Sequence, residues 1–113
     1  MQYMMLVCGD ENMELSAAEI DQMRTDTVAW VEEMDGRGVR KFGDRLRHTE
    51  SATTVRVRDG ETLLADGPFA ETKEQILGFD LLECADLEEA LAVAAAHPSA
   101  RLGTIEVRPL WVE

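Results

Sequence analysis

The stretch TTVRVRDGETLLADGPFAETKEQILGFDLLEC, residues 53–84, decides the fold of this chain. Between positions 55 and 58 valine alternates with arginine, which is the pattern of a strand with one buried face. Asp59 and Gly60 then supply the two positive-φ positions of a type I′ turn, so the segment predicts a tight hairpin. The turn sets the register, and one face of the hairpin collects four side chains: Val55, Val57, Thr62 and Leu64.

A bend is expected directly after the hairpin, at residues 66–69, Asp-Gly-Pro-Phe. Gly67 can adopt backbone conformations that are closed to other residues, and Pro68 restricts the residue before it. Two interpretations of this bend are open. It is either a rigid corner, or a corner that holds charged side chains around a pocket, since binding groups often lie on loops of a rigid scaffold.

The strand expected at 76–84 is apolar on both faces, and so is the strand expected at 3–8. Each is followed by a helix that opens with a capping residue, Ser16 in the first case and Asp86 in the second. The order is strand, helix, strand, hairpin, strand, helix, strand. It predicts an α+β fold, a ferredoxin-like split β-α-β sheet with both helices on one face.

The face of this sheet that carries no helix must also be buried, because its middle strands are apolar on that side too. A second copy of the same sheet is the simplest cover. We therefore expect one domain over residues 1–113 that forms a two-fold homodimer through its sheet face.

The formal net charge is −12, with 23 acidic residues against 11 basic ones. Nucleic-acid binding depends on Lys and Arg neutralising phosphates, so this balance argues against direct DNA or RNA contact and against an anionic membrane surface. No apolar run reaches the roughly 20 residues that cross a bilayer, and the N-terminus lacks a signal-sequence pattern, so we expect a cytoplasmic location. Cys8 and Cys84 have no metal-ligand spacing, so we expect free thiols, no metal and no cofactor.

Residues 66–75, Asp-Gly-Pro-Phe-Ala-Glu-Thr-Lys-Glu-Gln, and the Ile-Leu-Gly-Phe that follows resemble the signature of the DGPF subgroup of YCII-related proteins. Residues 52–56, 86–90 and 106–109 also resemble that family, so the likeness extends over nearly the whole chain. The resemblance implies that the homodimer is a dimeric α+β barrel. It also implies two functional directions, because some YCII-related proteins are suspected enzymes and DGPF proteins are often encoded beside extracytoplasmic-function sigma factors.

In the first functional hypothesis, the protein binds or acts on a small molecule by acid–base chemistry in a pocket between sheet and helices, near residues 66–73. Seven residues are candidates for that site: Asp66, Glu71, Lys73 and His48 as catalytic groups, and Arg56, Phe69 and Asp80 as substrate-binding groups. In the second, it is an acidic accessory protein of a sigma factor that does not touch DNA. A third alternative is a dimer without a site, in which Asp66 and Glu71 only fasten the loop. The sequence leaves all three open.

Overall fold

Six strands and two α-helices form along residues 1–112, the part of the chain that the computed structural model describes. In chain order the elements are β1 (Gln2–Gly9), α1 (Ala17–Gly36), β2 (Arg40–Arg45), a 3-10 turn η1 (Thr49–Ser51), β3 (Thr53–Arg58), β4 (Glu61–Asp66), β5 (Gln75–Glu83), α2 (Leu87–Ala95), a 3-10 turn η2 (Pro98–Arg101) and β6 (Thr104–Pro109). This is the order that the sequence predicts.

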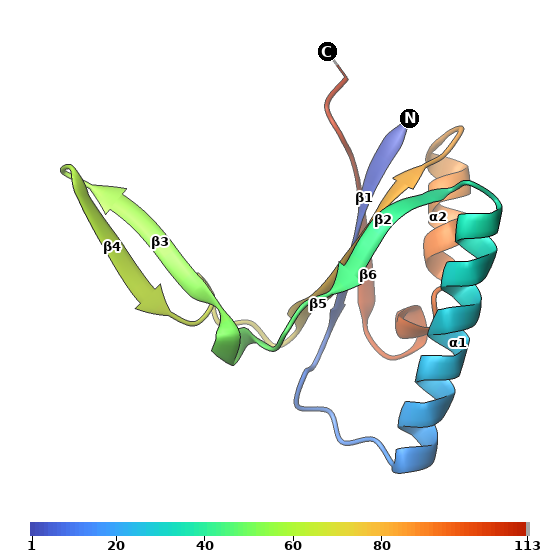
Figure 1. Cartoon of the computed structure of the whole chain (residues 1–113), viewed down its shortest axis with the longest axis horizontal. Helices are drawn as coiled ribbons and strands as arrows, with labels where there is room; N and C mark the ends of the chain where they lie inside the picture. The colour runs from blue at the N-terminus through green and yellow to red at the C-terminus, as the bar shows by residue number, and fades with distance from the viewer. Residues whose placement is uncertain (113) are drawn as a thin grey trace.

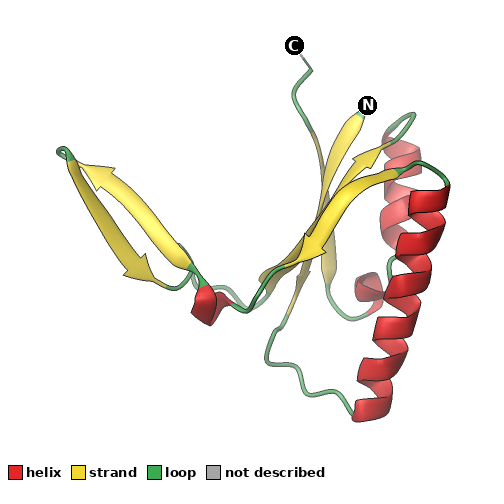
Figure 2. Cartoon of the chain, in the orientation of Figure 1, coloured by secondary structure: helices red, strands yellow, loops and turns green. Residues whose placement is uncertain are grey.

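Four strands form one antiparallel sheet in the order β2-β5-β1-β6, with β1 paired to both β5 and β6. This arrangement is the ferredoxin-like α+β fold, and the β3–β4 hairpin is inserted between its second and third strands. Both helices cover the same side of the sheet (Figure 1). Figure 2 shows the three parts plainly: red helices, the central yellow sheet, and the yellow hairpin beyond it.

Both helices begin where their capping residues predict. The hydroxyl of Ser16 accepts a hydrogen bond from the Glu19 N–H, and the Glu19 carboxylate accepts one from the Ser16 N–H, which completes a capping box. Asp86 caps α2 by accepting from the Glu89 N–H at 2.9 Å. Neither helix combines the length and apolar character that a membrane-spanning helix needs within the described residues.

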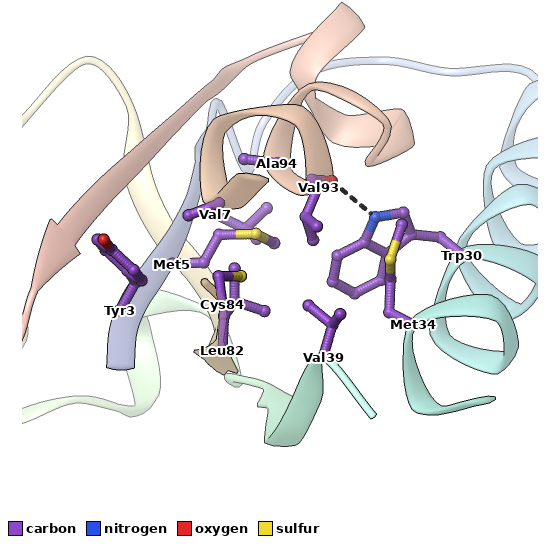
Figure 3. Close-up of a cluster of buried hydrophobic side chains, with 11 residues drawn as sticks. Tyr3, Met5, Val7, Trp30, Met34, Val39, Leu82, Cys84, Val93 and Ala94 are labelled. Atoms are coloured by element: carbon purple, nitrogen blue, oxygen red, sulfur yellow. Dashed lines mark hydrogen bonds between the residues drawn. The ribbon is translucent and has the colours of Figure 1, made fainter. Parts of the chain in front are cut away.

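The hydrophobic core lies between the helices and the sheet (Figure 3). Alternate residues of β1 point into it, and α1 contributes Trp30 and Met34. The indole N–H of Trp30 donates to the Val93 carbonyl at 3.0 Å, which joins α1 to α2. The buried ring of His97 packs edge-on against Trp30, with ring centroids 4.7 Å apart. The core therefore uses one face of the sheet only.

The opposite face of the sheet, called here the helix-free face, is also apolar. It carries the alternate residues of β1 and β5 and one residue of the edge strand β2: Met4, Leu6, Phe79, Leu81 and Phe42. Four of these are half-buried by their neighbours, whereas Phe42 is 60% exposed. The prediction that the sheet is apolar on both sides is confirmed, and the single chain leaves the second side uncovered.

The β3–β4 hairpin has the predicted register but not the predicted burial. Val55 pairs with Leu64, and both turn residues have positive φ, 51° at Asp59 and 78° at Gly60. The hairpin projects away from the sheet as a separate two-stranded ribbon (Figure 1). Its apolar face is exposed in this chain, so the expectation of a buried face is wrong for the single subunit.

Candidate functional site

The bend at 66–69 is fixed by backbone groups rather than by the Asp66 carboxylate. Gly67 has φ of 94°, a conformation that favours glycine. Its N–H donates to the Ala52 carbonyl at 2.7 Å, and the Thr54 hydroxyl donates to the Gly67 carbonyl at 2.8 Å. The bend is therefore tied to the chain that leads into β3.

The charged residues predicted to line a pocket are not brought together within one chain. Asp66, Glu71 and Lys73 are all exposed, and among residues 1–112 no ion pair joins them. Phe69 is 81% exposed, and Arg56 is exposed on the hairpin. The loop lies on the side of the sheet away from the helices (Figure 1). The expected position between sheet and helices is thus wrong, and a pocket lined by this loop belongs to the helix-free side.

Asp80, predicted to bind substrate, is instead buried in an ion pair on the helix-facing side of β5. The guanidinium of Arg40 donates from Nε to Asp80 at 2.7 Å, from Nη1 to Asp35 at 3.2 Å, and from Nη2 to the Gly43 carbonyl at 2.9 Å. Burial raises the pKa of Asp80, and the adjacent Arg40 opposes that shift. The carboxylate holds β2, β5 and the end of α1 together and is not presented to a ligand.

A polar cluster gathers at the root of the hairpin, where the chain leaves the sheet. The carboxylate of Glu11 accepts hydrogen bonds from both the hydroxyl and the backbone N–H of Thr49, the latter at 3.1 Å. The Thr49 hydroxyl is the main cause that lowers the pKa of Glu11, its N–H adds to the effect, and the charge of nearby His48 lowers that pKa further. The Glu11 carboxylate is therefore held by the residue that directly follows the exposed His48.

The same cluster ties down both ends of the loop that follows the hairpin. At one end Gly67 bonds to Ala52, directly after η1. At the other end the Gln75 side-chain carbonyl accepts from the Glu11 N–H at 3.0 Å. We call these residues, together with His48, which directly precedes Thr49, the hairpin base: Glu11, His48, Thr49, Gly67 and Gln75. Of the predicted catalytic residues, His48 is the one that adjoins this cluster along the chain.

Cys8 lies near this end of the sheet, opposite Ile76 of β5. Burial is the main cause that raises the pKa of its thiol, and the carboxylates of Glu106 and Glu74 raise it further. The Thr104 hydroxyl donates to Glu74 at 2.7 Å. A thiol kept protonated next to carboxylates is a small apolar side chain, as the sequence predicts for both cysteines. Among residues 1–112, three or more metal-ligating side chains do not gather anywhere.

Glu11 is not among the residues that the sequence predicts for a site. Glu11 and Thr49 are 38 residues apart, and no motif links them. Only the pairing of β1 with β5, which brings the end of β1 next to Gln75, places the two segments together. No signal in the single sequence carries that contact.

Two hollows of the surface lie away from the hairpin base. One is lined by the chain ends, including Met1, Glu83 and Trp111. The other lies where α2 meets β6 and is lined by small and branched residues such as Ala94 and Ile105. Neither is lined by a predicted site residue, so a ligand site at the hairpin base needs walls that the single chain does not supply.

The comparisons with known proteins agree with this architecture. The sequence profile of the YCII-related domain matches residues 1–113. An uncharacterised protein of Rhizobium meliloti (strain 1021) is 47% identical over 103 residues, which cover 74% of this chain and 82% of that relative. The chain therefore belongs to the YCII-related domain family.

Proposed function

We propose that this protein is a homodimer that binds a small molecule at the hairpin base, where His48 exchanges protons with it and Glu11 supports the imidazolium. One observation carries the proposal: both donors of Thr49 hold the Glu11 carboxylate, and the exposed His48 directly precedes Thr49 in the chain. Histidine is the side chain best suited to proton transfer near neutral pH, and an adjacent carboxylate stabilises its charged form. The proposal is of acid–base chemistry that needs no cofactor.

The loop at 66–73 supplies the remaining contacts in this proposal. Because Gly67 and Gln75 tie its two ends to the segments that carry His48 and Glu11, the loop borders the cluster. Asp66, Glu71 and Lys73 contribute charge for a polar ligand, and Phe69 with Arg56 provides the apolar and cationic contacts from the hairpin side. The DGPF run at 66–69 that forms this border supports placing the chain in the DGPF subgroup of the family.

The homodimer supplies the missing wall. The helix-free face exposes a row of apolar side chains that includes the 60%-exposed Phe42, and a second copy of the same face can bury it. Two sheets packed in this way give the dimeric α+β barrel. A site at the edge of such an interface is enclosed by both subunits, which explains why the loop residues are exposed in one.

A ligand-induced thermal shift tests the proposed site. A ligand that binds only the folded state raises the melting temperature in proportion to its affinity and concentration, so small carboxylic acids and lactones are screened against the purified protein. We expect hits to lose their shift in Glu11→Gln and His48→Gln. Glu14→Gln, an exposed acid in the same loop, is the matched control and keeps the full shift. Equal shifts in all three variants would contradict the site.

A second candidate function is docking to a sigma factor as an acidic accessory protein. The observation that favours it is the exposed outer surface of α1, which carries Asp21, Glu32 and Glu33. Complementary charge on a basic partner accelerates association and is weakened by salt. Salt-sensitive binding of a purified sigma factor that is lost on neutralising these three acids supports docking. Binding that is unchanged by the three substitutions would contradict docking through this surface.

A further inference from the structure

The β3–β4 hairpin presents an apolar face that its own chain does not cover. Val55 is 60% and Leu64 is 68% exposed, and Val57, the next residue of β3 on the same face, is also exposed. The two strands pack extensively on each other but not on the sheet or the helices. A two-stranded hairpin is at best marginally stable alone in water. This ribbon therefore needs a surface to pack against.

The opposite face of the hairpin is suited to water instead. It carries Arg56 and Arg58, and Arg58 pairs across the strands with Glu61. Leu63 is the one large apolar side chain on that side and is 46% exposed. Docking through the valine and leucine face thus leaves both arginines in solvent.

The size of the uncovered surface is that of a protein interface. The chain exposes 8147 Å², whereas a compact monomer of this mass exposes about 6,200 Å². The excess, about 1,900 Å², exceeds the roughly 800 Å² that each partner buries in a standard complex. The radius of gyration, 16.1 Å, likewise exceeds the about 13 Å of a compact domain of this length. The projecting hairpin accounts for both departures (Figure 1).

A second copy of this chain is the occupant that the two uncovered surfaces favour. The helix-free face of the sheet is apolar, and at its β2 edge the exposed ring of Phe42 lies 5.7 Å from that of Phe79. The hairpin and this sheet face belong to one chain, so a two-fold axis that places one hairpin on the partner's sheet does the same for the other. The hairpin contact is thus made twice, at the β2 edge of each sheet, beside the sheet-to-sheet contact proposed above.

We propose that the hairpin is an exchanged arm. In a two-fold dimer, Val55, Val57 and Leu64 of each subunit pack on the helix-free face of the other, next to Phe42. The inference rests on the proposed homodimer and deepens it, because the hairpin base is the root of the arm. Docking of the arm fixes the position of the 66–73 loop, so the ligand site is complete only in the dimer.

Leu64 and Leu63 provide a matched test, because they are adjacent leucines on opposite faces of the hairpin. Each is changed to arginine, and the dimer dissociation constant is measured by sedimentation equilibrium, with circular dichroism to confirm the fold. Leu64→Arg removes one buried leucine from each of the two arms and is expected to weaken the dimer about 100- to 10,000-fold. Leu63→Arg is expected to change the dimer dissociation constant by no more than about twofold, because the Leu63 side chain faces water.

Hydrogen exchange of the backbone amides in residues 53–66 gives a second readout. These amides are expected to be protected in the native dimer and to exchange faster in Leu64→Arg, while those of β1 and β5 stay protected. If Leu64→Arg dimerises as tightly as Leu63→Arg, the arm is wrong but the sheet-mediated dimer stands. If Phe42→Arg also has no effect on a native dimer, the helix-free face is not its interface. If the native protein is a monomer, both the arm and the proposed homodimer are wrong.

Discussion

The Nε atom of Arg40 lies 2.7 Å from a carboxylate oxygen of Asp80, in an ion pair that is largely buried under the end of α1. The same guanidinium reaches Asp35 and the Gly43 carbonyl, so one side chain joins a helix, an edge strand and a central strand. The presence of Asp80 in the otherwise apolar strand β5 is therefore explained by its structural ion pair with Arg40. The next two predictions follow from it.

Asp80→Ala is expected to destabilise the protein by about 3 kcal/mol, because it leaves the guanidinium of Arg40 buried without its main partner. The double variant Asp80→Ala/Arg40→Met is expected to lose less than the sum of the two single changes. Thermal and urea unfolding at fixed protein concentration measure both effects. Unchanged stability together with loss of ligand binding would instead restore Asp80 as a substrate contact.

Gly43→Ala is expected to destabilise by about 1–3 kcal/mol, since an added methyl group at this position would collide with the Asp80 carboxylate and the Phe79 carbonyl. Gly36→Ala is the matched control. Its Cβ meets no other atom within 4 Å, so the stability is expected to stay the same or rise by a few tenths of a kcal/mol. Equal unfolding midpoints for the two variants would show that the Gly43 contact is relaxed in solution.

His97 makes stability depend on pH. Burial lowers its pKa to about 4, and its Nδ1 accepts from the Ser99 N–H at 3.0 Å, which requires the neutral ring. Between the unfolded pKa of about 6.5 and the folded one, only the unfolded chain binds the proton. Stability is therefore full above about pH 6.5 and falls as the pH drops to about 4, by on the order of 3 kcal/mol in total.

The variant His97→Asn isolates this effect, because an asparagine oxygen can accept from Ser99 but does not titrate. The difference in unfolding free energy between native protein and variant is expected to change steadily from pH 6.5 down to 4 and to be flat above it. A constant difference over that range would mean that His97 is protonated in the folded protein as readily as in the unfolded chain.

The carboxylate at the hairpin base gives a prediction that does not require a known ligand. Hydrogen bonds from Thr49 lower the pKa of Glu11, so Thr49→Val, which removes the hydroxyl and keeps the N–H, is expected to raise that pKa toward its ordinary value. Carbon-detected NMR titration of the Glu11 carboxyl measures the change. An identical titration of Glu11 in both proteins would show that the Thr49 hydroxyl does not donate a hydrogen bond to this carboxylate.

The sequence predicts local structure well because local physics decides it here. The alternation around Asp59-Gly60 specifies the hairpin register, and Ser16 and Asp86 specify where the helices begin. The central strands are apolar on both faces and only two helices are predicted, so the sequence also predicts a sheet face that no helix covers. These signals lie within a few residues of each other, and the observed elements follow them closely.

Long-range placement is what the sequence could not supply. Nothing in the pattern of Val55 and Leu64 distinguishes a hairpin packed on its own sheet from one that projects away from it. The partner of Asp80 is 40 residues distant, and the contact between Glu11 and Thr49 spans 38. The packing of His97 against Trp30 is another example, because it joins two segments that lie far apart in the chain. Each of these contacts depends on the tertiary packing of segments that are distant in the sequence.

The proposed ligand site and the proposed exchanged arm both require that two copies of the chain associate. The most direct check is the molar mass of the unmodified protein in solution at micromolar concentration, from light scattering coupled to size exclusion. We predict a single species of twice the 12.6 kDa chain mass. A species of 12.6 kDa, with Phe42 and Leu64 accessible to solvent, would contradict the account.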